Sequence, residues 1–528
     1  MQRHRQDSVL KVHYALSVFV RTRFFSAENF LRKSGIAFRY PFFKKYMGEI
    51  IVVKKKKVND GAIYDARTLG TGKMLILGFQ HMFAMFGATV LVPLLTGLDI
   101  ATTLLFAGLG TLLFHVITKM KVPAFLGSSF AFLGGYAAIA PLDGKDGMTN
   151  VQLLPYACIG VACAGVVYLL LAACIKAVGV KRVMRFFPPV VTGPIIISIG
   201  LGLAGSAVNN CKANWLIACC ALAIVIIFNI WGKGMLKIIP ILLGVLGSCA
   251  IAAILALVCG KTITAADGAQ YIAAGGAEGL KLFSVSALEN FKNAAWIGFP
   301  IKFERTVFGG VDFSNTSLII SAIVAIMPIS LATMMEHIGD ISAISSTVGE
   351  NYIADPGLHR TLTGDGLATS IAALFGAPAN TTYGENTGVL ALSRVFDPRV
   401  IRIAACMAVL LSFSPKFAAL VELIPTAVIG GVSFILYGMI SAIGVRNVVE
   451  NAVDFTKSRN LIIAAVILVS ALGLGTVTFS IGGLAISLSA LATASILGIV
   501  LNAILPGKDY NFEAETPEQA KTGVSFEV

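Results

Sequence analysis

The sequence predicts an all-α polytopic membrane protein with about fourteen transmembrane segments. Hydrophobic residues make up 56% of the 528 residues, charged residues only 13%, and the mean hydropathy is +0.82. Soluble proteins carry about 25% charged residues, and a soluble chain of this length would have too few charges to cover its surface. The composition therefore excludes an ordinary soluble protein.

Long apolar windows recur along the chain. A helix needs about 20 mostly apolar residues to cross a bilayer, and several windows approach that length. Clear examples are Leu216–Trp231, Ile239–Val258, Ser317–Met335, Ile401–Phe413, Leu461–Leu474 and Ala485–Leu505. Other expected spans are short or interrupted, and those interruptions indicate the candidate site described below.

The net charge of +13 is distributed as in a membrane protein. Lys and Arg gather after every second expected span, as the positive-inside rule requires of cytoplasmic loops. The clusters are Lys119 and Lys121; Lys176, Lys181, Arg182 and Arg185; Lys233 and Lys237; Arg394, Arg399 and Arg402; and Arg446, Lys457 and Arg459. We therefore expect a multi-pass protein of the cytoplasmic membrane, with both termini cytoplasmic and the long loop at 260–313 outside. This distribution accounts for the basic charge without a nucleic-acid partner.

Both ends of the chain differ from its apolar middle. Residues 1–66 carry many Lys and Arg side chains and lack the apolar and cleavage regions of a standard signal peptide. We interpret them as a disordered basic tail, or as translated leader upstream of a true start at Met47. A third interpretation places them on the anionic cytoplasmic leaflet. Residues 507–528 are expected to form a cytoplasmic tail.

The nine cysteines give no sign of a metal or redox site. Most of them lie inside apolar runs, and none has the spacing of a zinc site. We interpret them as small buried hydrophobic residues, and we expect neither a metal nor a cofactor.

One pattern occurs twice, in the same order. LGFQHMFAMFG, with His81, corresponds to ATMMEHIGDISA, with Glu336 and His337. VPAFLGSSFAFLGG corresponds to GAPANTTYGENTG, which aligns Ser129-Phe130 with Thr382-Tyr383, and PPVVTGPIIISIG corresponds to IPTAVIGGVSFI. With an odd number of spans in each half, the second copy enters the membrane upside down. The sequence thus predicts two inverted seven-span repeats, the arrangement of secondary transporters.

The third span of each half is broken by Gly and Pro. Pro123 and Gly127 interrupt the first, and Gly376, Pro378, Gly384 and Gly388 interrupt the second. In inverted-repeat transporters such segments form the substrate site. We expect short extended segments in spans 3 and 10 that meet near the midplane, each followed by a half-helix. Their free backbone groups must bind each other or a ligand.

Ionisable residues lie where the bilayer is expected. An acidic residue at the centre of a membrane helix costs about 2.5–3.5 kcal/mol, so Glu336 and Glu385 indicate a function; pairing with a neighbouring helix is the alternative. Asp340 lies four residues after Glu336, on the same helical face. Because two carboxylates that close resist double ionisation, Glu336 and Asp340 are candidate proton carriers.

Other polar residues in apolar surroundings have less specific roles. His337 points about 100° away from Glu336 on a helix and serves a different contact. His81 is either a packing residue or a hydrogen-bond partner. His115 and Glu422 are expected at the membrane interface, and Asp365 at a helix start.

The residue types around the breaks indicate the ligand chemistry. Carboxylates accept hydrogen bonds and donate none when ionised, so the ligand offers adjacent N–H donors. Backbone N–H groups suit carbonyl oxygens, and Phe130 and Tyr383 can stack on a flat ring. A planar cyclic imide or lactam, as in a nucleobase, meets these demands. An anion would require Arg or Lys at the breaks, and the sequence shows none before Arg394.

Several motifs carry a family resemblance. Glu385-Asn386-Thr387-Gly388 followed by Ser393-Arg394 matches an E/Q-N-x-G…T/S-R signature, and QHMFAMFGATVLVP, VPAFLGSSFAF and EHIGD match as well. From about Gly72 to about Leu505 the chain resembles the nucleobase–ascorbate transporter family, and within it bacterial uracil permeases. Purine carriers more often have Gln–Asn and a final Gly in this motif.

The resemblance implies a domain organisation and an activity. Spans 1–4 and 8–11, at 67–185 and 314–417, would form a core domain. Spans 5–7 and 12–14, at 186–259 and 418–506, would form a gate domain, with residues 260–313 as the extracellular loop. The implied activity is proton-coupled import of uracil by a homodimer in the lipid bilayer, with the core sliding against the gate.

The resemblance also assigns the site. Glu336 and Glu385 would bind the pyrimidine N–H groups, the backbone at Phe130 and Gly384 its carbonyls, and Tyr383 would lie beside it. Asn386, His337, His81 and Ser129 are expected to support the site. Some relatives have His where this chain has Asp340, so the residue that carries the proton stays open between Glu336 and Asp340.

Two alternatives remain at this stage. One is a xanthine or other purine permease of the same family. The other is an anion transporter built on the same inverted-repeat architecture. A membrane enzyme fits less well, because the sequence has neither metal-ligand spacing nor a nucleophile elbow.

Overall fold

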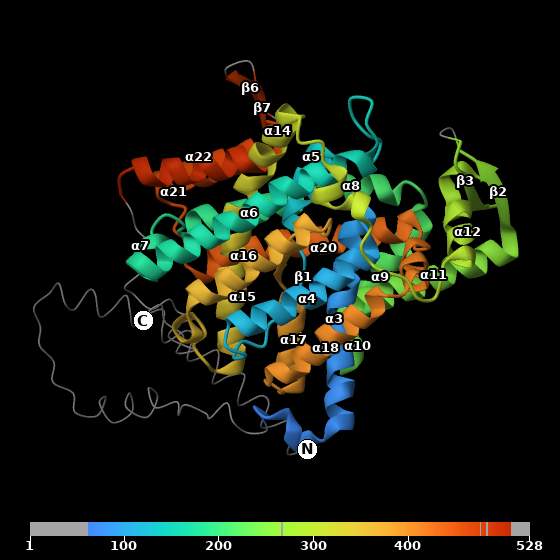
Figure 1. Ribbon diagram of the computed structural model, residues 1–528, viewed down its shortest axis with the longest axis horizontal. Coiled ribbons are helices and arrows are strands. Elements are labelled where there is room, and N and C mark those ends of the chain that lie inside the picture. The colour runs from blue at the N-terminus through green and yellow to red at the C-terminus, as the bar shows by residue number, and fades with distance from the viewer. Residues whose placement is uncertain (1–61, 266–267, 476, 482–483, 508–528) are drawn as a thin grey trace, which may run out of the picture. The chain divides into compact units, whose positions relative to one another are not determined.

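The protein is described from a computed structural model, which covers residues 62–265, 268–475, 477–481 and 484–507. Most of the predicted N-terminal tail and nearly all of the predicted C-terminal tail lie outside these residues. The described part consists mainly of helices, joined by a few short strands (Figure 1).

Seven helices among the described residues are long and apolar enough to cross a membrane. They are α3 (Thr71–Thr96), α4 (Ile100–Ile117), α6 (Asn150–Val178), α8 (Pro189–Cys211), α11 (Pro240–Cys259), the run Thr316–Val348 with α14 (Thr316–Ile326) and α15 (Ser330–Val348), and α20 (Thr426–Glu450). An eighth span results if α18 (Pro398–Ser412) and α19 (Pro415–Glu422), bent by 89°, count as one. The protein is thus a multi-pass membrane protein, and the number of about fourteen spans stays a prediction.

The remaining helices are shorter. Those that are apolar are Phe130–Ile139, which includes α5 (Leu133–Ile139), α9 (Trp215–Trp231), α21 (Ser458–Gly473) and α22 (Ala490–Ile504). The others are α7 (Val180–Met184), α10 (Met235–Ile238), α12 (Val285–Asn293), α13 (Val307–Gly310), α16 (Leu358–Leu374) and α17 (Gly384–Ser393).

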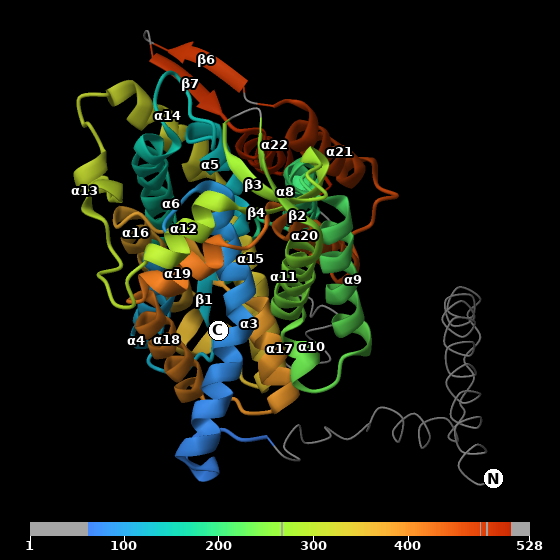
Figure 2. The ribbon, with the colours of Figure 1, turned by 90° about the vertical axis from the view of Figure 1, so that its right-hand side faces the viewer.

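One expected span is wrong in its extent. The window Ala485–Leu505 is divided between α22 and strand β7 (Leu484–Leu488), which pairs with β6 (Val477–Ile481) in an antiparallel register. Figure 2 shows this pair beyond the ends of the neighbouring helices. β-Branched and aromatic residues dominate β6, and such residues favour an extended backbone over a helix.

Helix ends follow the local sequence. α8, α11, α18 and α19 each begin with a proline, whose fixed φ suits the first helical turn and whose missing N–H is not needed there. Asp99 caps α4 by accepting a hydrogen bond from the Thr102 N–H, and Asn214 caps α9 in the same way through Ile217. These signals explain why the apolar runs break where they do.

The helices pack most extensively in two groups. In the first, α4 lies along α18, and α6 lies along α16 and α14. In the second, α8 lies along α20, and α9 lies along α11 and α20. The first group comes from 67–185 and 314–417, and the second from 186–259 and 418–506. These are the ranges expected as core and gate, although the division itself stays a prediction.

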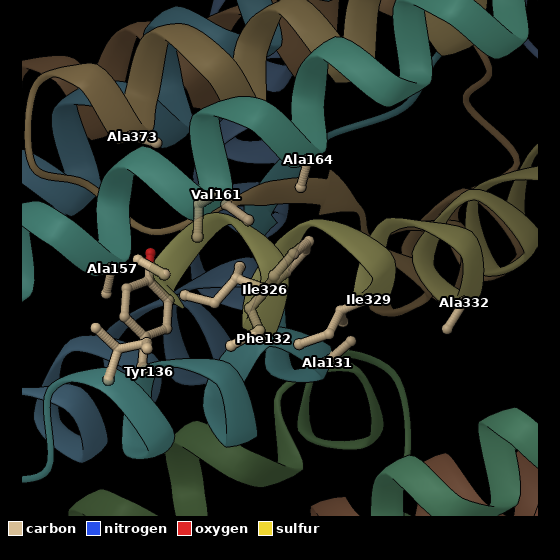
Figure 3. Packing of buried hydrophobic residues seen from close by; sticks show 14 of the residues in the cluster. Ala131, Phe132, Tyr136, Ala157, Val161, Ala164, Ile326, Ile329, Ala332 and Ala373 are labelled. Atoms are coloured by element: carbon tan, nitrogen blue, oxygen red, sulfur yellow. The ribbon is translucent and has the colours of Figure 1, made fainter. Parts of the chain in front are cut away.

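The first group is held by small residues and an apolar core. Gly165 of α6 and Gly366 of α16 approach so closely that a Cβ on Gly366 would lie 2.7 Å from the Gly165 carbonyl oxygen. Next to this contact, Phe132 and Tyr136 pack against α6 and against the run Thr316–Val348, where Ile326 lies (Figure 3). This core fixes the segment that follows the first broken span.

The predicted extended segments are present and pair with each other. Strand β1 (Leu126–Ser128) is antiparallel to β5 (Asn380–Thr382), with Gly127 opposite Thr381. The Ser129 N–H donates to the Ala379 carbonyl at 2.9 Å, and the Tyr383 N–H donates to Phe125 at 3.0 Å. At both ends of the pair, the residue that follows one strand thus donates its N–H to the residue just before the other strand.

The pairing gives Ser129 and Tyr383 the same hydrogen-bonding position, since the N–H of each donates across to the other segment. Phe130 and Gly384 come next along the chain. The sequence alignment matched Phe130 with Tyr383 instead, which differs from this hydrogen-bonding pattern by one residue. The inverted repeat itself stays a prediction.

The long loop has its own structure. A three-stranded antiparallel sheet of β2 (Gly260–Thr264), β3 (Gln270–Ala274) and β4 (Lys281–Ser284) precedes α12. The Lys281 N–H donates to the Ala213 carbonyl, between α8 and α9, at 3.0 Å. α12 lies beside α19 (Figure 2). α13, also part of this loop, lies beside α6 of the first group, so the loop contacts both groups of helices.

Candidate functional site

The candidate site is built around the β1–β5 pair. Each strand leads directly into a helical segment: Phe130–Phe132 and then α5 after β1, and α17 after β5. Neither Ser129 nor Tyr383, the residues before these segments, caps the following backbone with its side chain. The first N–H groups of both segments are therefore available to a ligand.

Three carboxylates lie beside these helix starts. Glu336 and Asp340 come from α15, and Glu385 comes from the first turn of α17; all three are half-buried. The Thr382 hydroxyl donates to Asp340 Oδ2 at 2.9 Å, which ties Asp340 to the end of β5. Gly384, the residue before Glu385, also lies close to Asp340: a Cβ on it would be 3.8 Å from Asp340 Oδ1. The role of these residues as a binding site stays a prediction.

Open space lies in front of the two helices. A Cβ added to Gly339 on α15 or to Gly388 on α17 would meet no atom within 4 Å, and one on Gly384 would meet only Asp340 Oδ1, at 3.8 Å. The backbone of α15 and α17 is thus uncovered at these three glycines, and Gly384 lies next to Asp340.

Tyr383 occupies a different place from the expected one. Its ring is 4% exposed, and its hydroxyl donates to the Ser128 carbonyl at 2.9 Å. The Thr89 hydroxyl on α3 donates to the Tyr383 oxygen at 3.2 Å. The ring therefore packs behind the strand pair, whereas Phe130 remains half-buried at the site.

His337 and Asp365 form a buried pair behind the carboxylates. His337 Nδ1 lies 2.9 Å from Asp365 Oδ2, and both side chains are 0% exposed. His337 points away from Glu336, as its position one residue later on the helix predicts. The expectation that Asp365 starts a helix is wrong, because it lies in the middle of α16. The sequence context TGDG suggested a cap, and only the facing α15 reveals the histidine.

His81 proves to be a hydrogen-bond partner. The Asn386 side-chain amide donates to the His81 carbonyl at 3.0 Å and lies 3.2 Å from His81 Nδ1. Both residues are buried, and the contact joins α3 to α17. Ser129 is also buried, and among the described residues its hydroxyl has no hydrogen-bond partner, while its backbone N–H belongs to the strand pair.

His115 is buried as well, contrary to expectation. It is 0% exposed on α4, and its Nε2 lies 2.9 Å from the Ala124 carbonyl oxygen, just before β1. The sequence prediction placed it at the membrane interface. It was wrong because a histidine near a helix end is found at interfaces in general, whereas here the returning chain covers it.

Sequence reasoning missed two further side chains. Tyr437 on α20 lies with its ring centroid 6.3 Å from that of Phe130, edge to face, so the second helix group borders the site there. Thr89 lies on α3 within the matching motif QHMFAMFGATVLVP, but no role was assigned to it. For Tyr437 the sequence carries no signal that separates it from ordinary helix packing. Within the described residues no set of His, Cys, Asp and Glu side chains could hold a metal ion.

The fold resembles that of solved anion transporters. The chain matches the transmembrane domain of a cyanobacterial bicarbonate transporter, BicA, with a TM-score of 0.55 and 14% identity, over 83% of this chain and 99% of that one. It also matches SLC26A9 with a TM-score of 0.54 and 10% identity, over 88% of this chain and 69% of that one. At such low identity these similarities show the fold alone.

Sequence comparisons identify the family. The family model described as "Permease family" matches residues 72–480. The uracil permease of Bacillus subtilis is 38% identical over 484 residues, covering 88% of this chain and 99% of that protein. That of Escherichia coli K12 is 36% identical over 443 residues, covering 81% and 90%. The chain belongs to this permease family, that of the nucleobase–ascorbate transporters, and is a membrane transporter rather than an enzyme.

Proposed function

We propose that this protein imports uracil together with protons across the cytoplasmic membrane. The observation that carries the proposal is the pair of half-buried carboxylates, Glu336 and Glu385, beside uncapped backbone at Phe130 and Gly384. The substrate is supported by the relatives' names, since proteins with 36–39% identity to this chain are called uracil permeases.

The proposed site matches the polar groups of uracil. Uracil has two ring N–H groups and two carbonyl oxygens. Ionised carboxylates accept from N–H groups, which suits Glu336 and Glu385. The N–H groups at the starts of the two helical segments donate to carbonyl oxygens, and Phe130 offers a ring face for stacking. Asn386 and His81 hold α17 against α3, and His337 holds α15 against α16.

Asp340 and Glu336 are the proposed proton carriers. Asp340 accepts a hydrogen bond from Thr382, directly before the helix that carries Glu385. A change in the protonation of Asp340 would therefore alter the hydrogen bond next to the start of α17. Proton binding at this cluster would relieve repulsion among three carboxylates and so favour the loaded site.

The proposed movement is a sliding of the first helix group against the second, in a homodimer embedded in lipid. The packing of α4, α6, α16 and α18 with one another, and of α8, α9, α11 and α20 with one another, supports two such bodies. Phe130 and Tyr437 come from the two different bodies and meet edge to face, so both would border the substrate on one side.

An anion substrate is not favoured by the site. The fold relatives include a bicarbonate transporter, but three carboxylates would repel an anion rather than bind it. A fold shared at 14% identity does not transfer a substrate.

The experiment is uptake of radiolabelled uracil in cells that lack their own uracil carriers, with and without a protonophore. We expect saturable uptake that the protonophore abolishes. Uptake that stays the same after the protonophore has removed the proton gradient would contradict proton coupling. Saturable uptake of labelled xanthine, measured in parallel, without uptake of labelled uracil would replace the substrate with a purine, and inhibition by bicarbonate or sulfate would revive the anion alternative.

A further inference from the structure

Three buried residues from separate elements are joined in a closed ring of hydrogen bonds. The Tyr383 hydroxyl donates to the Ser128 carbonyl at 2.9 Å, the Ser128 hydroxyl donates to the Thr89 carbonyl at 3.0 Å, and the Thr89 hydroxyl donates to the Tyr383 oxygen at 3.2 Å. Thr89 belongs to α3, Ser128 to β1, and Tyr383 connects β5 to α17. The ring thus ties both halves of the candidate site to one helix.

The ring leaves little freedom to its members. Thr89, Ser128 and Tyr383 are 0%, 1% and 4% exposed, so water does not replace a lost partner. A Cβ on Gly127 would lie 2.5 Å from a Tyr383 ring carbon and 2.7 Å from the Thr89 hydroxyl oxygen. The ring of Tyr383 is therefore seated in a place that only a glycine leaves open.

The Thr89 hydroxyl has a second possible acceptor, the sulfur of Met85. Met85 Sδ lies 3.3 Å from the Thr89 hydroxyl oxygen, and the single hydroxyl proton serves one acceptor at a time. A phenolic oxygen accepts more strongly than a thioether sulfur. Tyr383 then uses its own proton toward Ser128, so each donor in the ring has an acceptor.

We propose that Thr89 is a positioning residue for substrate binding. Its hydroxyl, through Tyr383 and Ser128, fixes the distance between the backbone at Phe130 and the first turn of α17 with Glu385. Those two places lie next to Ser129 and Tyr383 along the chain, so a shift of Tyr383 moves both sets of ligand-binding groups apart. This inference rests on the proposed function, because it concerns the site that would hold uracil.

The test compares variants that keep or remove the hydroxyl. Thr89→Val removes it at nearly constant shape, and Thr89→Ser keeps it. Tyr383→Phe removes the acceptor of this bond together with the bond that Tyr383 donates to the Ser128 carbonyl. Thr96→Val is the matched control: Thr96 is a buried threonine on the same helix whose hydroxyl bonds to the Val92 carbonyl one turn earlier. Uracil Kd on the purified full-length protein, KM and Vmax of uptake, and membrane abundance are measured for each.

We expect Thr89→Val to raise Kd and KM about tenfold, since loss of one buried hydrogen bond costs roughly this factor. Tyr383→Phe, which loses two such bonds, should raise them at least as much. Abundance and Vmax should stay near those of the wild type in both. Thr89→Ser and Thr96→Val should stay within about twofold of the wild type. The double variant should equal Tyr383→Phe alone, because that substitution already removes the bond from Thr89.

Two results would overturn the inference. One is an unchanged Kd in Thr89→Val. The other is a Thr89→Ser protein as weak as Thr89→Val, which would assign the effect to side-chain packing at this position and not to the hydroxyl. Should Thr89→Val fail to fold, Tyr383→Phe and Thr89→Ser decide alone.

A ligand-free measurement separates this inference from the proposed function. Hydrogen–deuterium exchange of peptides covering 125–131 and 379–385 reports the strand pair without uracil. Faster exchange in Thr89→Val but not in Thr89→Ser supports the ring even if the wild type binds no uracil, in which case only the proposed substrate falls. Equal exchange in both variants and the wild type counts against the ring itself.

Discussion

Glu336 and Glu385 lie on two different helices, and a separate polar contact supports each helix. Glu385 belongs to α17, which Asn386 joins to His81 on α3. Glu336 belongs to α15, which His337 joins to Asp365 on α16. The acidic side chains are thus held by neighbours whose own polar groups point away from the site. At the scale of single residues, the site is a pair of acceptors on two separately supported helices.

Glu385→Gln is expected to reduce uracil uptake about a hundredfold. The amide turns one of the two acceptor atoms into a donor that faces the substrate N–H, and losing a charged hydrogen-bond partner at a binding site costs about 2–5 kcal/mol. Initial uptake rates over a range of uracil concentrations give the ratio of Vmax to KM. Glu422→Gln, at the exposed end of α19, is the control and should transport normally. Wild-type uptake by the Glu385 variant would place that residue outside the site.

His337→Ala is expected to lower the free energy of unfolding by about 3–5 kcal/mol, because it leaves the Asp365 carboxyl buried without its partner. Combining it with Asp365→Leu should recover part of the loss, since the unpaired polar group is then gone. Thermal unfolding in detergent measures both effects. Additive losses in the double variant would show that the two side chains do not act as a pair.

At the scale of elements, the β1–β5 pair is the feature that organises the site. Three-residue strands would not be stable alone. They persist here because α3 supplies Thr89 on one side and α15 supplies Asp340 on the other, with hydrogen bonds to Tyr383 and from Thr382. The strand pair therefore sets the positions of the two helical segments that follow it.

Gly127→Ala tests how tightly the pair is packed. The new methyl would lie 2.5 Å from a Tyr383 ring carbon, and such overpacking costs about 1–3 kcal/mol. We expect a lower unfolding temperature and weaker uracil binding. Gly205→Ala on α8, where a Cβ meets nothing within 4 Å, is the matched control and should be neutral or slightly stabilising. Equal behaviour of the two variants would contradict the close packing at Gly127.

At the scale of the whole described chain, the loop at 260–313 is fastened to both groups of helices. Its sheet bonds to the turn between α8 and α9 through Lys281. Its second half crosses the other group, where Lys302 Nζ lies 2.9 Å from Asp99 Oδ2 and the Thr102 hydroxyl donates to the Pro300 carbonyl at 2.6 Å. Any displacement of one group against the other would therefore strain this loop.

Asp99→Asn is expected to loosen the second half of the loop. Burial by itself would raise the pKa of Asp99, but the hydrogen bond from the Thr102 N–H and the neighbouring Lys302 outweigh it and hold that pKa below its ordinary value. The stabilisation is then fully present above the ordinary carboxyl pKa of about 3.9 and is lost only as the pH falls through the lower folded value.

The measurement is trypsin cleavage after Lys302 and Arg305 in membranes, followed over time. We expect cleavage of the Asn variant to be several-fold faster than that of the wild type, by the same factor from about pH 6 to about pH 8, because Asp99 stays ionised throughout that range. Asp143→Asn, on an exposed turn, is the control. A ratio that changes across this range, or no difference at all, would show that the charge of Asp99 does not hold the loop.

Much of the fold follows from patterns within single segments. Long apolar runs gave the membrane helices, and proline and glycine in two of them gave the extended segments, because these effects depend on residues near one another in the chain. The boundary of the last expected span failed where Leu484–Leu488 pairs with strand β6, which is rich in β-branched residues. The aligned residues of the two halves differ by one position from the hydrogen-bonding pattern of β1 and β5, because side-chain types do not reveal hydrogen-bond phase.

The sequence by itself determined the membrane class, the place of the two breaks and the carboxylates Glu336 and Glu385 beside them, since composition and spacing suffice for these. Only the tertiary structure decided which partners those residues meet. In the structure, Tyr383 bonds to Thr89 and Ser128 instead of lying beside the ligand. His337 pairs with Asp365, and Tyr437 lies next to Phe130. These contacts join residues far apart in the chain, and their geometry depends on how whole helices pack, which no local pattern encodes.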